Sequence, residues 1–160
     1  MDRNFEENRP LAAPGLAVGG GSKYTFKYGN SVSCKANGIV STVTTTADAP
    51  ALTTAKNKSG TTPTTLAIDY CRVYTLLSAV NADTGAQTFT LVVGEDFPET
   101  RPMKMSDINF GNSADNDAKK AVVGWIYIFN TTNVFTPGST ALDASGVTTR
   151  YFDNYGFIGF

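Results

Sequence analysis

The stretch AVVGWIYIFNTTNVFTPGSTALD, residues 121–143, gives the clearest structural signal in this chain of 160 residues. Its first nine positions are apolar apart from Gly124, and a turn-rich run follows from Asn130 to Thr140. Such a run is too short to span a bilayer as a helix, and it suits a strand buried on both faces. We therefore predict a central strand over residues 121–129, followed by a turn at 136–140 that directs the next segment.

The two faces of that strand carry different side chains. Because side chains alternate along a strand, Trp125, Tyr127 and Phe129 share one face. The opposite face then receives Val122, Gly124, Ile126 and Ile128. We expect one face to lie in the core and the other to be covered by a second layer of the domain or by a neighbouring subunit.

The composition favours an all-β protein. The chain is 41% hydrophobic but only 17% charged, below the roughly 25% that is typical of soluble domains. Threonine, with its branched Cβ, suits a pleated strand, and glycine and asparagine supply turns. We predict an antiparallel β-sandwich or barrel-like domain, because short strands separated by turns are typical of both.

Further strands are predicted from alternating apolar residues. They cover residues 24–28, 32–36, 39–46, 66–80, 88–93 and 147–152. Asn37-Gly38 indicates a hairpin, because a type I′ turn needs positive φ at both central residues. The turn at 81–85 joins a second hairpin. Residues 48–65 and 94–116 are predicted to be loops, and residues 114–120 are compatible with one helical turn.

The first 22 residues predict an extended N-terminal arm, followed by a single β-rich domain over residues 23–160. Pro10 and Pro14 stiffen this arm, and the glycines at 19–21 form a hinge. Such an arm could be deleted without loss of folding; a disordered terminus is the alternative. The apolar side chains with which the arm would contact a neighbouring subunit are Leu11, Leu16 and Val18.

Aromatic side chains are dense at the C-terminus. A chain end gains nothing from exposing them, so they indicate a partner surface. We therefore predict that this tail makes intersubunit contacts through Tyr151, Phe152, Tyr155, Phe157 and Phe160.

Histidine is absent from the chain. Its absence excludes Ser-His-Asp and Cys-His sites and removes the commonest metal ligand. The acidic residues at 95–99 could supply paired carboxylates, but basic residues at 101–104 favour a solvated or ion-paired loop. The run Asp115–Asp117 lacks the glycine and distal glutamate of a calcium loop. We expect no catalytic residue, no metal site and no cofactor.

Charge and cysteine usage limit the partners and the compartment. Thirteen basic residues against fourteen acidic ones give no global attraction to nucleic acid or to an anionic membrane. The first ten residues lack the apolar core of a signal peptide, so export by the usual route is not expected. Cys34 and Cys71 form no Cys-x-x-Cys motif, and we expect buried, reduced thiols. A disulfide is the alternative, which requires an oxidising environment and Cα atoms within about 7 Å.

Three segments share their order and pattern with one family of proteins. They are YGNSVSCKANGIV (28–40), VYTLLSAVNADTGAQTFTLVVG (73–94), and VGWIYI (123–128) followed by Asn130 and FTPGSTALD (135–143). In this order the chain, over residues 23–155, resembles tailed-bacteriophage capsid decoration (cement) proteins and related structural proteins of the virion head. The resemblance contains no catalytic signature. The aromatic C-terminus and the two cysteines have no counterpart in it.

The resemblance implies a noncatalytic protein that decorates and stabilises the outside of an icosahedral phage head by bridging capsid subunits. The implied partners are the major capsid protein and copies of this chain, with no nucleic acid and no membrane. The implied location is the virion, after assembly in the host cytoplasm. One alternative is another virion component, such as a head fibre base or a tail protein. Another is a carbohydrate-binding β-sandwich that uses aromatics such as Trp125 or Tyr155. An enzyme would need carboxylates that converge in one pocket.

Overall fold

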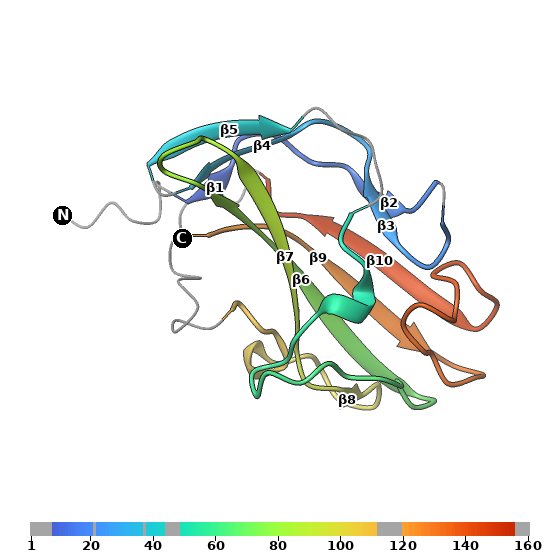
Figure 1. The fold of residues 1–160 in the computed structure, drawn as a ribbon. Coiled ribbons are helices and arrows are strands. Elements are labelled where there is room, and N and C mark those ends of the chain that lie inside the picture. Colours follow the sequence, from blue (N-terminus) through green and yellow to red (C-terminus); the bar gives the residue numbers. More distant parts are fainter. Residues whose placement is uncertain (1–7, 21, 37, 44–48, 112–119, 156–160) are drawn as a thin grey trace.

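The computed structural model describes residues 8–20, 22–36, 38–43, 49–111 and 120–155. Within these ranges the chain consists of antiparallel sheets packed against each other, with two short 3₁₀ helices and no α-helix (Figure 1). This confirms the all-β fold class. The arrangement is a sandwich, and no sheet of the described ranges closes into a barrel.

The elements follow one another along the chain with loops of very different length. They are β1 (Arg9–Pro10), β2 (Leu16–Val18), β3 (Phe26–Tyr28), β4 (Val32–Ala36), β5 (Ile39–Val43), η1 (Leu52–Thr54), β6 (Tyr70–Val80), β7 (Gln87–Val93), β8 (Phe97–Pro98), η2 (Met105–Asp107), β9 (Ala121–Asn130) and β10 (Val147–Asp153).

The largest sheet has the order β10-β9-β6-β7, and β8 pairs with the start of β6. A second sheet has the order β1-β4-β5, and β2 pairs with β3. The apolar run of the sequence is β9, which lies between β6 and β10. The predicted central strand is therefore confirmed.

The main core lies between the large sheet and the smaller ones. From β4 it takes Val32, Cys34 and Ala36, whereas the intervening Ser33 and Lys35 are half-buried. On β3, the rings of Phe26 and Tyr28 are 6.3 Å apart in an edge-to-face arrangement, a geometry that aromatic pairs favour. The alternating apolar residues of these segments are thus the ones that face the main core.

Both predicted hairpins are present. Ala36 pairs with Ile39, so a two-residue turn joins β4 to β5, and Gly38 has the positive φ of 76° that this turn requires. Asn37 lies outside the described residues. In the β6–β7 hairpin, the side-chain oxygen of Asn81 accepts hydrogen bonds from the backbone N–H groups of Asp83 and Thr84.

A β-bulge changes which residues of β9 face the core. Leu76 pairs with Gly124 but Leu77 pairs with Val122, so Val123 is an extra residue on β9. Val123 and Ala121 therefore join Ile126 and Ile128 in the main core, and Val122 is only half-buried. The prediction that Val122 shares a face with Ile126 was wrong. It assumed strict alternation along the strand, and the extra residue of the bulge interrupts that alternation.

The N-terminal segment packs against its own chain. β1 pairs with β4, β2 pairs with β3, and Leu16 is a member of the main core. Asp153 at the end of β10 accepts hydrogen bonds from the backbone N–H groups of Gly15 and Leu16. Residues 8–20 are thus built into the sandwich instead of extending from it, and residues 1–7 lie outside the described part.

The two cysteines are free and buried, as predicted. Cys34 lies in the main core between the sheets, whereas Cys71 belongs to a separate cluster. None of the elements described above is a helix long and apolar enough to cross a membrane.

Candidate functional site

The large sheet has a second apolar face, which we call the outer face because it points away from the main core. It carries Trp125, Tyr127 and Phe129 of β9, which are half-buried. Register places the side chain of Phe152 on β10 opposite Trp125. The buried residues of this second cluster are Cys71, Val73, Phe97 and Ile108. The second layer that the sequence required is thus supplied, in part, by the chain itself.

Residues 94–111 form the segment that covers part of the outer face, and we call it the covering loop. Phe97 and Ile108 are its buried anchors. The side-chain amide of Asn109 donates to the carbonyl oxygen of Val93 at 3.1 Å, which fixes the far end of the loop to β7. Gly94 is required at the near end, because a Cβ there would collide with the backbone carbonyl of Asp107.

An ion pair holds the middle of the covering loop. Both carboxylate oxygens of Asp107 accept hydrogen bonds from the guanidinium of Arg101, each at 2.7 Å, and the backbone N–H of Lys104 also donates to Asp107. The hydrogen bonds from Arg101 are the main reason that the pKa of Asp107 falls from 3.8 to about 2. The same guanidinium lies 5.0 Å from the ring centre of Phe97, within the range of a cation–π contact.

Cys71 is the thiol on the outer face, and its surroundings do not activate it as a nucleophile. Burial raises the pKa of Cys71, whereas a reactive cysteine needs a lowered one. Its sulfur lies 2.9 Å from the hydroxyl oxygen of Tyr127. Burial, together with this contact, also raises the pKa of Tyr127 to about 12. Both groups are therefore protonated at neutral pH.

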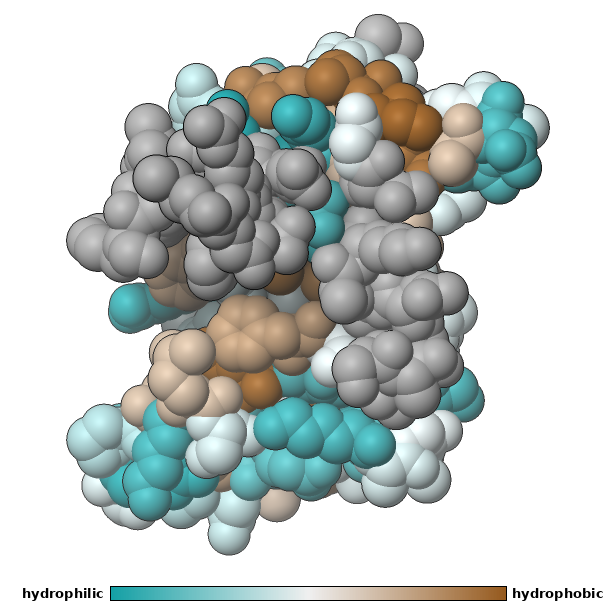
Figure 2. Space-filling view, turned by 90° about the vertical axis from the view of Figure 1, so that its left-hand side faces the viewer, coloured by the Kyte–Doolittle hydropathy of each residue, from teal (hydrophilic) through white to brown (hydrophobic). Residues whose placement is uncertain are grey.

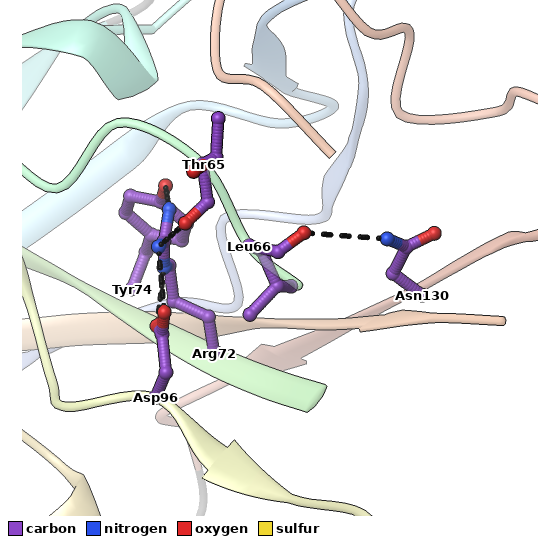
Figure 3. A network of polar contacts seen from close by, with 6 residues as sticks. All are labelled: Thr65, Leu66, Arg72, Tyr74, Asp96 and Asn130. Carbon is purple, nitrogen blue, oxygen red and sulfur yellow. Dashed lines mark hydrogen bonds and ion pairs between the residues drawn. The ribbon is translucent and has the colours of Figure 1, made fainter. Parts of the chain in front are cut away.

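The acidic residues at 95–99 do not converge. Asp96 accepts two hydrogen bonds from the guanidinium of Arg72, at 2.6 and 2.9 Å, and Arg72 also contacts Tyr74 and the carbonyl of Thr65 (Figure 3). Glu95 and Glu99 are exposed. Arg72 is almost fully buried, so Asp96 serves to compensate its charge. Across the described ranges, no three acidic or cysteine side chains are grouped so as to hold a metal ion; Asp115–Asp117 lies outside them.

The predicted contact residues lie in different environments. Leu16 is in the main core, and Val18 and Tyr151 pack against it half-buried. Leu11 is half-buried beside β4, where its N–H donates to Ser33. Phe152 and Tyr155 are exposed, by 49% and 54%. Phe157 and Phe160 lie outside the described residues.

The covering loop adds exposed apolar side chains that the sequence did not indicate. Met103, Met105 and Phe110 are exposed by 51%, 71% and 41%. Their segment lacks any apolar periodicity, so only the fold could show that Ile108 turns inwards while Phe110 turns out. Together with Phe152 and Tyr155, these three residues form the candidate contact set of the protein.

Trp125 is a poor platform for a sugar ring. Its side chain is half-buried between β6 and β10, and its indole N–H is buried without a hydrogen-bond partner. An aromatic that stacks on a ligand would need an open ring face, and Phe152, opposite Trp125 on β10, is the more exposed of the two rings. This geometry weighs against the carbohydrate-binding alternative at Trp125.

Comparison with known proteins identified no relative of this chain. No protein-family model matches the chain, and no curated protein or solved structure is significantly similar to it.

Proposed function

We propose that this chain is a noncatalytic structural protein of a phage virion, which decorates the outside of the head and bridges capsid subunits. The observation that carries the proposal is the candidate contact set of Met103, Met105, Phe110, Phe152 and Tyr155. These five side chains are exposed by between 41% and 71%. Methionine and aromatic residues are enriched in protein interfaces.

The covering loop is suited to carry a contact surface because it is held both internally and against the sheet. The Arg101–Asp107 ion pair joins two parts of the loop to each other. The Asn109 amide and the buried anchors Phe97 and Ile108 attach the loop to the sheet. A surface that is ordered before binding loses little conformational entropy when it docks. The exposed methionines can still adapt, because their side chains are unbranched and polarizable.

The sequence resemblance points to the same partner. A cement protein stabilises a shell through buried area and repeated attachment, without chemistry. Such a role needs apolar side chains that point outwards, and the candidate contact set supplies them.

A binding assay with phage heads tests the proposal. Heads of the phage that encodes the chain, prepared without it, are mixed with the purified protein and sedimented. We expect saturable binding, which is strongly reduced by the double substitution Met105→Gln and Phe152→Ser. The matched control Tyr24→Ser removes an aromatic of similar exposure, 44% against 49% for Phe152, from outside the contact set. It should bind like the wild type.

No saturable binding to the heads would overturn the proposal. Equal loss of binding in the control and in the double variant would show that the contact set is not the interface. All variants are compared by thermal unfolding first, so that loss of fold is not mistaken for loss of contact.

A further inference from the structure

The outer edge of β5 carries no charged residue or proline, and no strand of the described residues pairs with it. Pairing in the described residues places β4 on one side of β5 and no strand on the other. The sequence of β5 is IVSTV, without charge, proline or glycine. Natural sheets guard exposed edges with charged residues, proline or bulges, because unpaired backbone groups are a template for another chain.

The register identifies which backbone groups are unpaired. In a two-residue hairpin the residues that flank the turn, here Ala36 and Ile39, form a hydrogen-bonded pair. Since hydrogen-bonded pairs alternate with non-bonded ones, Cys34 and Ser41 form the next such pair. The N–H and C=O groups of Val40 and Thr42 therefore point away from β4.

A hydrogen bond on the opposite side of β4 supports this assignment. The carbonyl of Ser33, which is the partner of Thr42 in the register, accepts from the N–H of Leu11 at 2.7 Å. Ser33 thus directs its backbone towards β1 and not towards β5, as a non-bonded pair requires. Thr42 in turn directs its own backbone groups to the free edge.

The free edge is complementary to itself. When β5 pairs antiparallel with a second copy about a two-fold axis at Ser41, Val40 lies opposite Thr42 of the partner subunit, and Thr42 lies opposite Val40 of the partner subunit. Both outward-facing residues then form hydrogen-bonded pairs, and uncharged β-branched side chains meet across the strands. A two-fold interface of this kind is closed, so it ends at a dimer.

Side-chain exposure at this edge agrees with a contact surface. Val40 is 57% exposed, the most exposed aliphatic residue among the large hydrophobics of the described chain apart from methionine. Figure 2 shows hydrophobic side chains at the upper end of the molecule, the end at which Figure 1 places β4 and β5.

We propose that β5 is a self-association edge, through which two copies of this chain join their three-stranded sheets into one continuous sheet. The partner is a second copy, because the strand is self-complementary in register and carries no charge that would select another partner. The inference depends only on the sheet geometry, so it holds or fails independently of any binding to phage heads.

The test measures the mass of the full chain by light scattering over a wide range of protein concentration. We expect the mass to rise from that of one chain to that of two. Val40→Lys should keep the chain monomeric, because it places like charges near each other across the two-fold axis. The matched control Val134→Lys, at a valine that is 53% exposed outside β5, should dimerise like the wild type.

Hydrogen exchange locates the interface without a substitution. The amides of Val40 and Thr42 should become protected as the concentration rises. The amide of Ser41 should not change, because it already pairs with Cys34. A monomer at every concentration, or a dimer that Val40→Lys leaves intact, would overturn the proposal. Protection of Val40 and Thr42 in the dilute monomer would overturn it too, since another part of the same chain would then occupy the edge.

Discussion

Gly94 shows how closely the covering loop packs on the large sheet. Its N–H donates to the carbonyl of Val73, and the carbonyl of Asp107 lies where a Cβ would be. The neighbouring atoms belong to the backbone, so they cannot move aside as the end of a flexible side chain would. Residue 94 therefore has to be glycine for steric reasons and not for a special φ.

We expect Gly94→Ala to lower the free energy of unfolding by about 1–3 kcal/mol, the usual cost of forcing atoms into a packed site. Urea unfolding of both proteins measures the difference. Gly20→Ala is the matched control, because its Cβ would meet only the flexible side chain of Lys27, at 3.5 Å. It should change stability by less than about 0.5 kcal/mol. Equal stability of the two variants would contradict the packing described for Gly94.

Asp107 makes the stability of the protein depend on acid. Its pKa is lowered from 3.8 to about 2, mainly by hydrogen bonds from Arg101. Because the pKa is lower in the folded state than in the unfolded state, the ionised carboxylate stabilises the fold at every pH above the ordinary pKa of the group. This stabilisation is lost as the pH falls from about 4 towards 2.

We therefore expect Asp107→Asn to be less stable than the wild type at neutral pH, and to lose less further stability below pH 4. Arg101→Gln should flatten the acid dependence in the same way, because it removes the partner that lowers the pKa. Unfolding curves at neutral pH and at several values down to about 2 measure both effects. An acid dependence identical to that of the wild type in both variants would show that the ion pair contributes nothing.

Among the elements, the N-terminal strands differ most from expectation. The sequence of residues 1–22 suggested an arm that could be removed, yet Leu16 lies in the main core and Asp153 holds the backbone of residues 15 and 16. Deleting residues 1–18 removes a core side chain and leaves the Asp153 carboxylate without these two N–H donors.

The deletion of residues 1–18 should lower the free energy of unfolding by at least about 2 kcal/mol, the lower end of the cost of truncating a buried leucine. Deleting residues 1–7 alone leaves β1, β2 and Leu16 in place and serves as the control. Denaturant unfolding distinguishes the two. A 1–18 deletion as stable as the 1–7 deletion would restore the view of a removable arm.

An element could be predicted from the sequence when the interactions that form it lie within a few residues of each other. β4 and the Asn37-Gly38 hairpin follow from alternation and turn chemistry within a few residues, and both were predicted. The bulge at Val123 depends on the partner strand β6, so β9 was predicted but the faces of its first residues were not. β2 is three residues long and is a strand only because β3 lies beside it. Two of the five residues of the candidate contact set, Phe152 and Tyr155, were named from the sequence because of the aromatic tail. The exposure of Met103, Met105 and Phe110 is set by the tertiary packing of the covering loop.

The whole molecule combines a β-sandwich with two surfaces suited to protein contacts. One is the candidate contact set around the outer face, and the other is the uncharged edge of β5. Of the contact set, Phe152 lies on β10 of the large sheet, whereas β5 belongs to the second sheet. A protein with one surface for a shell and another for its own copy could attach as a pair, which would multiply weak contacts through avidity.

The central claim is that this chain binds the outside of a phage head. If a phage genome encodes the chain, cryo-electron microscopy of purified heads of that phage tests the claim most directly. We predict density that fits the β-sandwich on the outer surface, with residues 103–110 and Phe152 turned towards the shell. Heads that lack this density and lack the chain by mass spectrometry would contradict the account.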